Sequence, residues 1–221
     1  MKKNCLILFL ILNSMVAYSQ YRTEKDYLGF EGYERSYEIY VPEKYSEKIK
    51  YPVVFVLHGG GGTAKGLIRS TRARFNYLAN RDNFIAVYPN GIKKSWNDGA
   101  RDTIGIARKL KINDVGFIDK IIENLILKYS IDNESIFACG ISNGGFMSQK
   151  LAFELSDKIK GIGVVAANLS EVQSKNSFPQ KPVPVIFING TKDPLIPYNG
   201  GYVTVLNKKR GKVLSVDKSI D

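Results

Sequence analysis

A serine hydroxyl flanked by glycines is the part of this chain best suited to chemistry. Gly140, Ser142 and Gly144 spell G-x-S-x-G within the stretch GISNGG. In this pattern the serine sits on a sharp, strained turn between a strand and a helix, and side chains at the glycine positions would crowd that turn. The pattern alone is weak. It predicts a nucleophile only if a strand precedes it, a helix follows it and partners exist elsewhere.

A serine nucleophile needs dipoles that receive the negative charge developing on the substrate oxygen. Asn143 follows Ser142 at the predicted start of a helix, so its backbone N–H is expected to point toward the site. A second N–H is expected from the loop His58-Gly59-Gly60-Gly61-Gly62, which follows a predicted buried strand. Gly60 is the first choice for this oxyanion-hole donor and Gly61 the second.

An acidic partner is expected after Ser142 in chain order. Asp193 follows the apolar run Val185–Ile188, and a loop after a late strand can reach the elbow at the carboxyl edge of the sheet. The competing interpretation is an aspartate that caps a turn. Asp114 and Asp132 are interpreted more simply as a helix start and a turn residue.

The general base is the difficulty, because His58 is the only histidine in the chain. It belongs to the glycine loop and precedes both Ser142 and Asp193, so chain order favours a structural role for it. We therefore expect no complete catalytic triad. So few histidines and cysteines also supply no zinc or haem ligand set, and we expect no metal and no cofactor.

The first twenty residues are predicted to be a secretory signal peptide. Lys2 and Lys3 precede the apolar run Leu6–Leu12, and Ala17-Tyr18-Ser19 supplies small residues before Gln20. The apolar run is too short to span a bilayer well, and a retained anchor is the alternative. We expect a secreted, extracellular protein, with the periplasm as the alternative compartment, and no stable membrane insertion.

Composition indicates one globular domain over residues 21–221, since 44% of the 221 residues are hydrophobic. Without the signal segment, Cys139 is the only cysteine, and its apolar surroundings predict a buried, inert thiol. The net charge is +11, and removing Lys2 and Lys3 leaves +9. The basic residues form no stripe interleaved with aromatics, so we expect no nucleic-acid partner. No feature predicts the oligomeric state.

Strands and helices are predicted to alternate along the chain. Tyr37, Ile39 and Val41 have the strand period of two, and apolar runs predict further strands at 53–57, 84–88, 135–139, 162–166 and 183–188. Helical patterns occupy 63–80, start at Asp114, and follow the elbow as a stripe from Phe146 to Ile159. Residues 21–34 are interpreted as a lead-in and 92–112 as a long loop carrying the only tryptophan, Trp96, which suits a cleft wall or a core position equally. The alternation predicts an α/β fold with a mostly parallel sheet and helices on both faces.

Several stretches together resemble one family. They are YPVVFVLHGGG (51–61), VYPNG (87–91), Trp96, NDVGFI (113–118), YSID (129–132), GISNGG (140–145) and GTKDPLIPYNG (190–200). Residues 36 to 205 resemble the secreted α/β-hydrolase esterases of the polyhydroxybutyrate depolymerase and feruloyl/acetylxylan esterase group. The resemblance implies an α/β-hydrolase fold, with Ser142 as nucleophile and Asp193 as triad acid. Members of that family continue to a histidine near their end, so the domain is expected to be incomplete at its C-terminus.

The leading hypothesis is therefore a secreted serine esterase that acts on a polymeric or small ester substrate. It would hydrolyse feruloyl or acetyl esters of xylan, or a polyhydroxybutyrate-type polyester, through an acyl-enzyme on Ser142. Without the triad histidine, this chain is expected to be inactive or a fragment. The alternative is a non-catalytic secreted protein that binds a polysaccharide or another polymer. A peptidase on the same fold is a third class, which nothing in the sequence selects.

Overall fold

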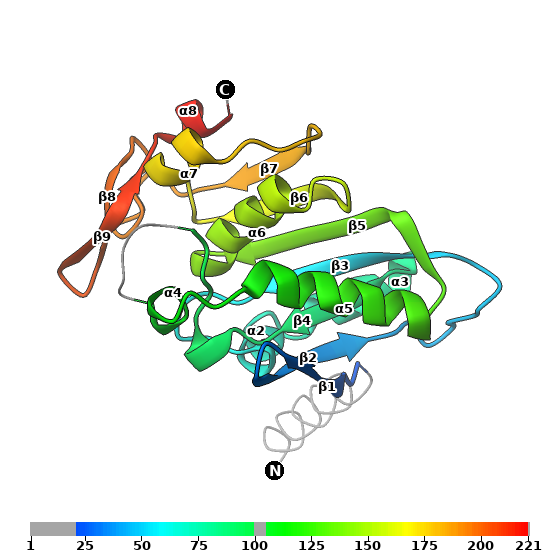
Figure 1. The fold of residues 1–221 in the computed structure, drawn as a ribbon. Coiled ribbons are helices and arrows are strands. Elements are labelled where there is room, and N and C mark those ends of the chain that lie inside the picture. The colour runs from blue at the N-terminus through cyan, green and yellow to red at the C-terminus, as the bar shows by residue number, and fades with distance from the viewer. Residues whose placement is uncertain (1–20, 100–104, 221) are drawn as a thin grey trace, which may run out of the picture.

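A seven-stranded sheet forms the centre of the computed structural model, which describes residues 21–99 and 105–220 (Figure 1). Its strand order is β1-β2-β4-β3-β5-β6-β7. The strands are β1 (Glu24–Phe30), β2 (Tyr33–Tyr40), β3 (Tyr51–Leu57), β4 (Ile85–Pro89), β5 (Ile131–Ile141), β6 (Ile159–Val165) and β7 (Val185–Ile188). β2 pairs antiparallel with β1 and β4, whereas the strands from β4 to β7 pair in parallel. The predicted α/β fold with a mostly parallel sheet is confirmed.

Helices cover both faces of the sheet, because the central strands are apolar on both sides. Phe55 and Leu57 of β3 pack into the core cluster that contains residues of α5 and α6, whereas Val56 packs into the cluster formed with α2 and α3. This two-sided burial explains the uninterrupted apolar run of β3. The helices are α2 (Ala64–Ser70), α3 (Arg74–Asp82), the 3-10 turn η1 (Ile92–Lys94), α4 (Ile106–Lys109), α5 (Asp114–Lys128), α6 (Asn143–Glu154), α7 (Glu171–Asn176) and α8 (Val216–Ile220).

A second, two-stranded sheet follows β7 and was not predicted from the sequence. It is the hairpin β8 (Gly201–Val205) and β9 (Lys208–Val213). In Figure 1 this hairpin lies at the left, at the end of the molecule toward which the arrow of β7 points. The backbone N–H of Thr204 donates to the carbonyl of Leu195 over 2.9 Å. This bond attaches the hairpin to the loop that carries Asp193.

The prediction of a lead-in at residues 21–34 was wrong, because Glu24–Phe30 forms the edge strand β1. Its residues pair with β2 through a two-residue turn at Glu31 and Gly32, both with positive φ, at 47° and 79°. Two consecutive positive φ values match the twist of a hairpin, but Glu-Gly lacks the Asn or Asp that usually marks such a turn. Edge strands also bury little surface, so their apolar alternation is weak.

Two other segments differ from the sequence-based prediction. The segment 92–112 is not a plain loop, since it contains η1 and α4. The helix after the elbow ends at Glu154, and Ile159 opens β6 instead of continuing the helical stripe. The predicted helix start at Asp114 is confirmed, and Asn113 caps α5 by accepting the N–H of Gly116. Each difference arises where tertiary packing overrides local periodicity.

No helix within residues 21–99 and 105–220 is both long and apolar enough to cross a membrane. The predicted signal peptide lies in residues 1–20, outside the described part of the chain.

Candidate active site

Ser142 occupies the turn between β5 and α6, as the sequence pattern predicts. Its backbone has φ 53° and ψ −120°, in a region that L residues rarely adopt. Its N–H donates to the carbonyl of Val165 over 2.9 Å, which joins the turn to the end of β6. The strained conformation is therefore held from both sides, by the strand before it and by the neighbouring strand.

The glycines of the elbow are required by close backbone approaches. A Cβ on Gly140 would lie 2.4 Å from the carbonyl carbon and oxygen of Gly144. A Cβ on Gly144 would lie 2.3 Å from the carbonyl oxygen of Leu57, at the end of β3. Only glycine at these two positions lets α6 begin this close to the sheet.

The glycine loop after β3 lies directly against the elbow. An ideal Cβ built on Gly59 would be 3.7 Å from the Cβ of Ser142, and one on Gly60 would be 3.7 Å from the Cβ of Asn143. The N–H of Gly61 donates to the carbonyl of Lys94 over 2.8 Å, so it already has an acceptor. Of the two glycine candidates, Gly60 is the one whose N–H has no acceptor among residues 21–99 and 105–220.

Asn143 is the first residue of α6, so its N–H has no acceptor one turn earlier in the helix. The backbone N–H groups of Gly60 and Asn143 are therefore both uncommitted and close to Ser142. Two such donors beside a serine are the arrangement that an oxyanion needs.

The side chain of Asn143 is fixed by a buried polar network that sequence reasoning missed. Its Oδ1 accepts the backbone N–H of Trp96 over 2.8 Å, and its Nδ2 donates to Oδ2 of Asp98 over 2.6 Å. Asp98 is fully buried and also accepts from Nε of Arg108 over 2.7 Å and from a second nitrogen of the same guanidinium. The network fixes the start of α6, and hence the direction of its first N–H groups.

Trp96 is a core residue that also lines the pocket beside Ser142. It is fully buried, and its Nε1 donates to the carbonyl of His58 over 2.8 Å. Its ring packs against that of His58 at 4.7 Å between centroids. A single tryptophan in a stretch of polar and glycine residues was the one sequence signal that could have located this contact.

His58 holds the glycine loop through hydrogen bonds of both ring nitrogens. Its Nδ1 lies 2.8 Å from the carbonyl of Gly59, and its Nε2 accepts the N–H of Gly91 over 3.0 Å. These partners define the neutral tautomer that is protonated on Nδ1. Burial lowers the pKa of His58 below its ordinary value, which also favours the neutral ring. With both nitrogens engaged, His58 has no free position from which to accept the proton of Ser142.

Asp193 lies in the loop after β7, as the sequence predicts. Its Oδ1 accepts the backbone N–H groups of Leu195 and Ile196 over 2.8 and 3.0 Å. This carboxylate oxygen therefore caps a turn, which was the competing interpretation. Oδ2 has no hydrogen bond within residues 21–99 and 105–220, so it is the oxygen that could orient a histidine.

A second buried carboxylate, Asp114, supports the loop that carries Trp96. Its Oδ1 lies 2.7 Å from a guanidinium nitrogen of Arg35, and both side chains are almost fully buried. Its Oδ2 accepts the backbone N–H of Asn97 over 2.7 Å, one residue from Trp96. Burial raises the pKa of Asp114 and the charge of Arg35 opposes that rise. Asp114 therefore joins β2, the loop of Trp96 and α5, a role that its position at a helix start did not indicate.

A pocket of about 520 Å³ opens beside Ser142. Its walls come from the glycine loop, η1, the turn before α4, the start of α6, the Asp193 loop and the β8–β9 hairpin. The lining residues used below are Gly60, Lys93, Lys94, Trp96, Arg108, Ser142, Asn143, Arg210 and Lys212. A volume of this size accommodates a small organic group.

Cys139 lies one residue before the elbow glycine, in β5. Burial raises the pKa of its thiol to about 12, so it is protonated at neutral pH. Within the described residues, no three His, Cys, Asp or Glu side chains are grouped closely enough to hold a metal ion.

The sheet order, the strained serine after β5 and the glycine loop after β3 define an α/β-hydrolase fold. Residues 43–210 match the model of the phospholipase/carboxylesterase family, and the chain belongs to that family.

Curated relatives are similar over most of this chain. Probable feruloyl esterase C of Aspergillus terreus is 30% identical over 179 residues, which are 79% of this chain and 60% of the relative. Feruloyl esterase C of Emericella nidulans is 29% identical over 177 residues, 78% of this chain and 60% of the relative. The chain thus spans less than two thirds of the length of these relatives.

Solved structures share the fold at lower identity. A thermostable esterase superposes with a TM-score of 0.57 at 18% identity, over 79% of this chain and 48% of that one. A ferulic acid esterase superposes with a TM-score of 0.52 at 23% identity, over 71% of this chain and 63% of that one. Acetyl xylan esterase from Aspergillus awamori superposes with a TM-score of 0.50 at 20% identity, over 64% of this chain and 51% of that one. The feruloyl and acetylxylan part of the expected resemblance is confirmed, and the polyhydroxybutyrate depolymerase part stays a prediction.

Proposed function

We propose that this chain is a secreted serine carboxylic ester hydrolase, with residues 21–221 forming its α/β-hydrolase domain. The observation that carries the proposal is the position of Ser142. It stands at a strained elbow on the wall of a pocket of about 520 Å³, next to the uncommitted N–H groups of Gly60 and Asn143. Secretion rests on the pattern of the first twenty residues.

The chemistry follows from these groups. Oγ of Ser142 attacks the ester carbonyl carbon, and the N–H groups of Gly60 and Asn143 stabilise the negative charge on the carbonyl oxygen. The alcohol leaves with a proton, and an acyl-enzyme on Ser142 remains. Water then attacks the same carbonyl carbon, releases the acid and restores the serine hydroxyl.

Each of these steps requires a base that takes and returns a proton. In the proposal Asp193 orients a histidine through its Oδ2, and the 221-residue sequence contains no histidine besides His58. Because both nitrogens of His58 are engaged elsewhere, this chain is expected to hydrolyse esters slowly. Loss of the base typically lowers the rate by several orders of magnitude.

The proposed substrates are esters of a polymer. The names of the relatives, feruloyl esterase and acetyl xylan esterase, support feruloyl or acetyl esters of xylan. A polyhydroxybutyrate-type polyester is the second substrate class, on the strength of the sequence resemblance alone.

Hydrolysis of 4-nitrophenyl acetate tests the role of Ser142, with added imidazole as an external base. The unchanged protein is expected to hydrolyse the ester faster than its Ser142→Ala variant. The difference in rate should be small without imidazole and larger with it. Subtracting the rate measured with the variant removes the contribution of the direct reaction between imidazole and the ester. Equal rates for the two proteins under both conditions would show that Ser142 does no chemistry.

A second candidate function is non-catalytic binding of a polysaccharide or another polymer. It is favoured by the engagement of the only histidine and by Tyr202, which is 46% exposed on the hairpin next to the pocket. Retention on insoluble xylan or polyhydroxybutyrate, without hydrolysis, is the expected outcome for this candidate. Failure to bind any polymer would reject it.

A further inference from the structure

The charged side chains that line the pocket beside Ser142 are all cationic. Its charged lining residues are Lys93, Lys94, Arg108, Arg210 and Lys212, and no Asp or Glu occurs among the described residues of its wall. Like charges around a partly enclosed volume raise its positive potential, because the low-dielectric walls focus the field. A neutral acyl or alcohol group would gain nothing from these charges, although it could pack against apolar lining residues such as Trp96 and Phe146.

Two of the five cations already have partners. Arg108 forms an ion pair with the buried Asp98. The ammonium group of Lys212 lies 5.0 Å from the ring centroid of Tyr202. Lys93, Lys94 and Arg210 remain, and none of the three side chains has a hydrogen bond or ion pair with residues 21–99 or 105–220. Their charges are available to a ligand.

Arg210 is carried by a β-bulge in the hairpin. Tyr202 pairs with Lys212 and Thr204 with Lys209, so two residues of β9 oppose one residue of β8. Gly211, with φ 109°, is the second of these two residues. A bulge of this kind redirects side chains and is often found beside active sites. It places Arg210, which is only partly exposed, on the pocket wall.

The two lysines are held by strained backbone on another wall of the pocket. Lys93 and Lys94 have φ of 48° and 62°, two consecutive left-handed residues without a glycine. The carbonyl of Lys94 accepts the N–H of Gly61, so this turn is fixed to the glycine loop beside Ser142. Strain of this sort persists where the surroundings impose it and is concentrated at functional sites.

We propose that this pocket selects ester substrates that carry a carboxylate, with Arg210 as the main contact and Lys93 and Lys94 supplying additional positive potential. Guanidinium and carboxylate match in planar, two-point geometry, and such charge-assisted hydrogen bonds are stronger than neutral ones. The inference rests on the proposed function, because it names the substrate class of the same site. The carboxylate could belong to the acyl part or to the alcohol part of the ester.

Equilibrium binding of intact esters to the Ser142→Ala chain tests the proposal without any need for hydrolysis. Monomethyl terephthalate carries a carboxylate on the acyl side, and methyl 4-carbamoylbenzoate is its neutral match. 4-Acetoxybenzoate carries a carboxylate on the alcohol side, and 4-acetoxybenzamide is its neutral match. Isothermal titration calorimetry at low ionic strength gives the dissociation constant of each ligand.

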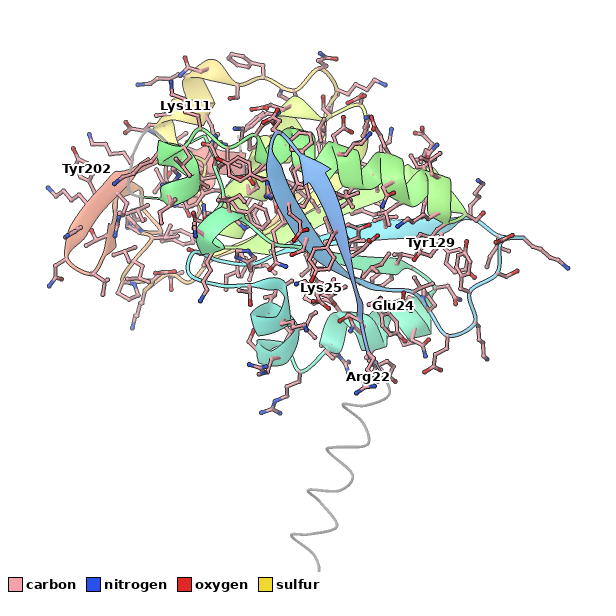
Figure 2. All side chains as sticks on the ribbon, turned by 60° about the horizontal axis from the view of Figure 1, so that its bottom comes forward. Arg22, Glu24, Lys25, Lys111, Tyr129 and Tyr202 are labelled. Carbon is pink, nitrogen blue, oxygen red and sulfur yellow. The ribbon has the colours of Figure 1, made fainter. Side chains whose placement is uncertain are left out.

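The carboxylate is expected to tighten binding about tenfold in at least one of the two pairs, which identifies the side that carries it. Arg210→Gln should remove most of this preference, and added salt should weaken it. Arg22→Gln is the matched control, since it removes the same charge outside the pocket. Figure 2 shows Arg22 beside the start of β1, well away from the hairpin that carries Tyr202.

Three results would overturn the proposal. The first is equal affinity for the anionic and neutral members of both pairs, and absence of binding by all four ligands counts in the same way. The second is a preference that survives Arg210→Gln combined with Lys93→Gln. The third is a loss of the carboxylate preference in Arg22→Gln as large as the loss in Arg210→Gln, which would assign the effect to the overall charge of the protein. None of these results depends on whether Ser142 hydrolyses an ester, so the two proposals fail separately.

Discussion

The amide nitrogen Nδ2 of Asn143 donates to Oδ2 of Asp98 over 2.6 Å, and the carboxylate that accepts this bond is fully buried. The bond connects the first residue of the helix after the elbow with the loop of Trp96. Through it, a carboxylate remote in sequence fixes the backbone that is proposed to stabilise the oxyanion.

Asn143→Ala is therefore expected to destabilise the protein by about 1–3 kcal/mol, because it leaves Asp98 with one hydrogen bond fewer in a buried position. Urea unfolding at neutral pH measures the change. Asn199→Ala is the control, since Asn199 is exposed and a change there should stay within about 0.5 kcal/mol. Equal effects of the two substitutions would show that the network does not hold the helix start.

Gly144→Ala is expected to abolish folding or to destabilise by more than about 4 kcal/mol, because its Cβ would meet backbone atoms at 2.3 Å. Gly190→Ala is the matched control, since the nearest atoms to its Cβ lie at 3.8 Å, an ordinary contact. Soluble yield and thermal unfolding compare the two variants. A Gly144→Ala protein as stable as the Gly190→Ala protein would contradict the packing described for the elbow.

Arg35→Met or Asp114→Leu alone is expected to lower the free energy of unfolding by about 3–5 kcal/mol, because each leaves a buried charge uncompensated. The double change Arg35→Met with Asp114→Leu should cost much less than the sum of the single changes. The exposed pair Lys120–Glu123 serves as the control, and its removal should leave the free energy of unfolding nearly unchanged. Additive losses for the buried pair would show that the ion pair does not couple the two residues.

The pH dependence of stability should report on His58. Burial lowers the pKa of this imidazole in the folded state, so the unfolded chain binds the proton more readily. The contribution of His58 is therefore fully present above its ordinary pKa of about 6.5 and is lost as pH falls through that value toward the lower folded pKa. The free energy of unfolding should decrease between about pH 7 and 5.5.

His58→Gln should flatten this part of the curve, whatever its effect on stability at pH 7. No other histidine titrates in this range, since His58 is the only one in the chain. A decrease of the same steepness in the variant would assign the titration to other groups.

Local sequence was sufficient to predict most of the sheet and half of the site. The runs at 53–57 and 84–88 are short, rich in β-branched and aromatic residues and apolar without interruption, as is typical of strands buried on both faces of a parallel sheet. The elbow could be found because close backbone contacts require glycine at fixed spacing, such as the contact between Gly140 and Gly144. β1 escaped prediction because an edge strand buries too little surface to show a clear alternation.

The sequence by itself determined that Ser142 would stand on a strand-to-helix turn, that Asp193 would follow the last strand of the parallel sheet, and that His58 is the only imidazole. These are properties of residue type and chain order. Only the tertiary structure decided that His58 has both ring nitrogens engaged, that Gly61 has already given its N–H to Lys94, and that Asp98 fixes Asn143. Apart from the bond between His58 and the adjacent Gly59, those contacts join residues separated by tens of positions. Burial and hydrogen-bond geometry between distant segments leave no periodic pattern in the chain.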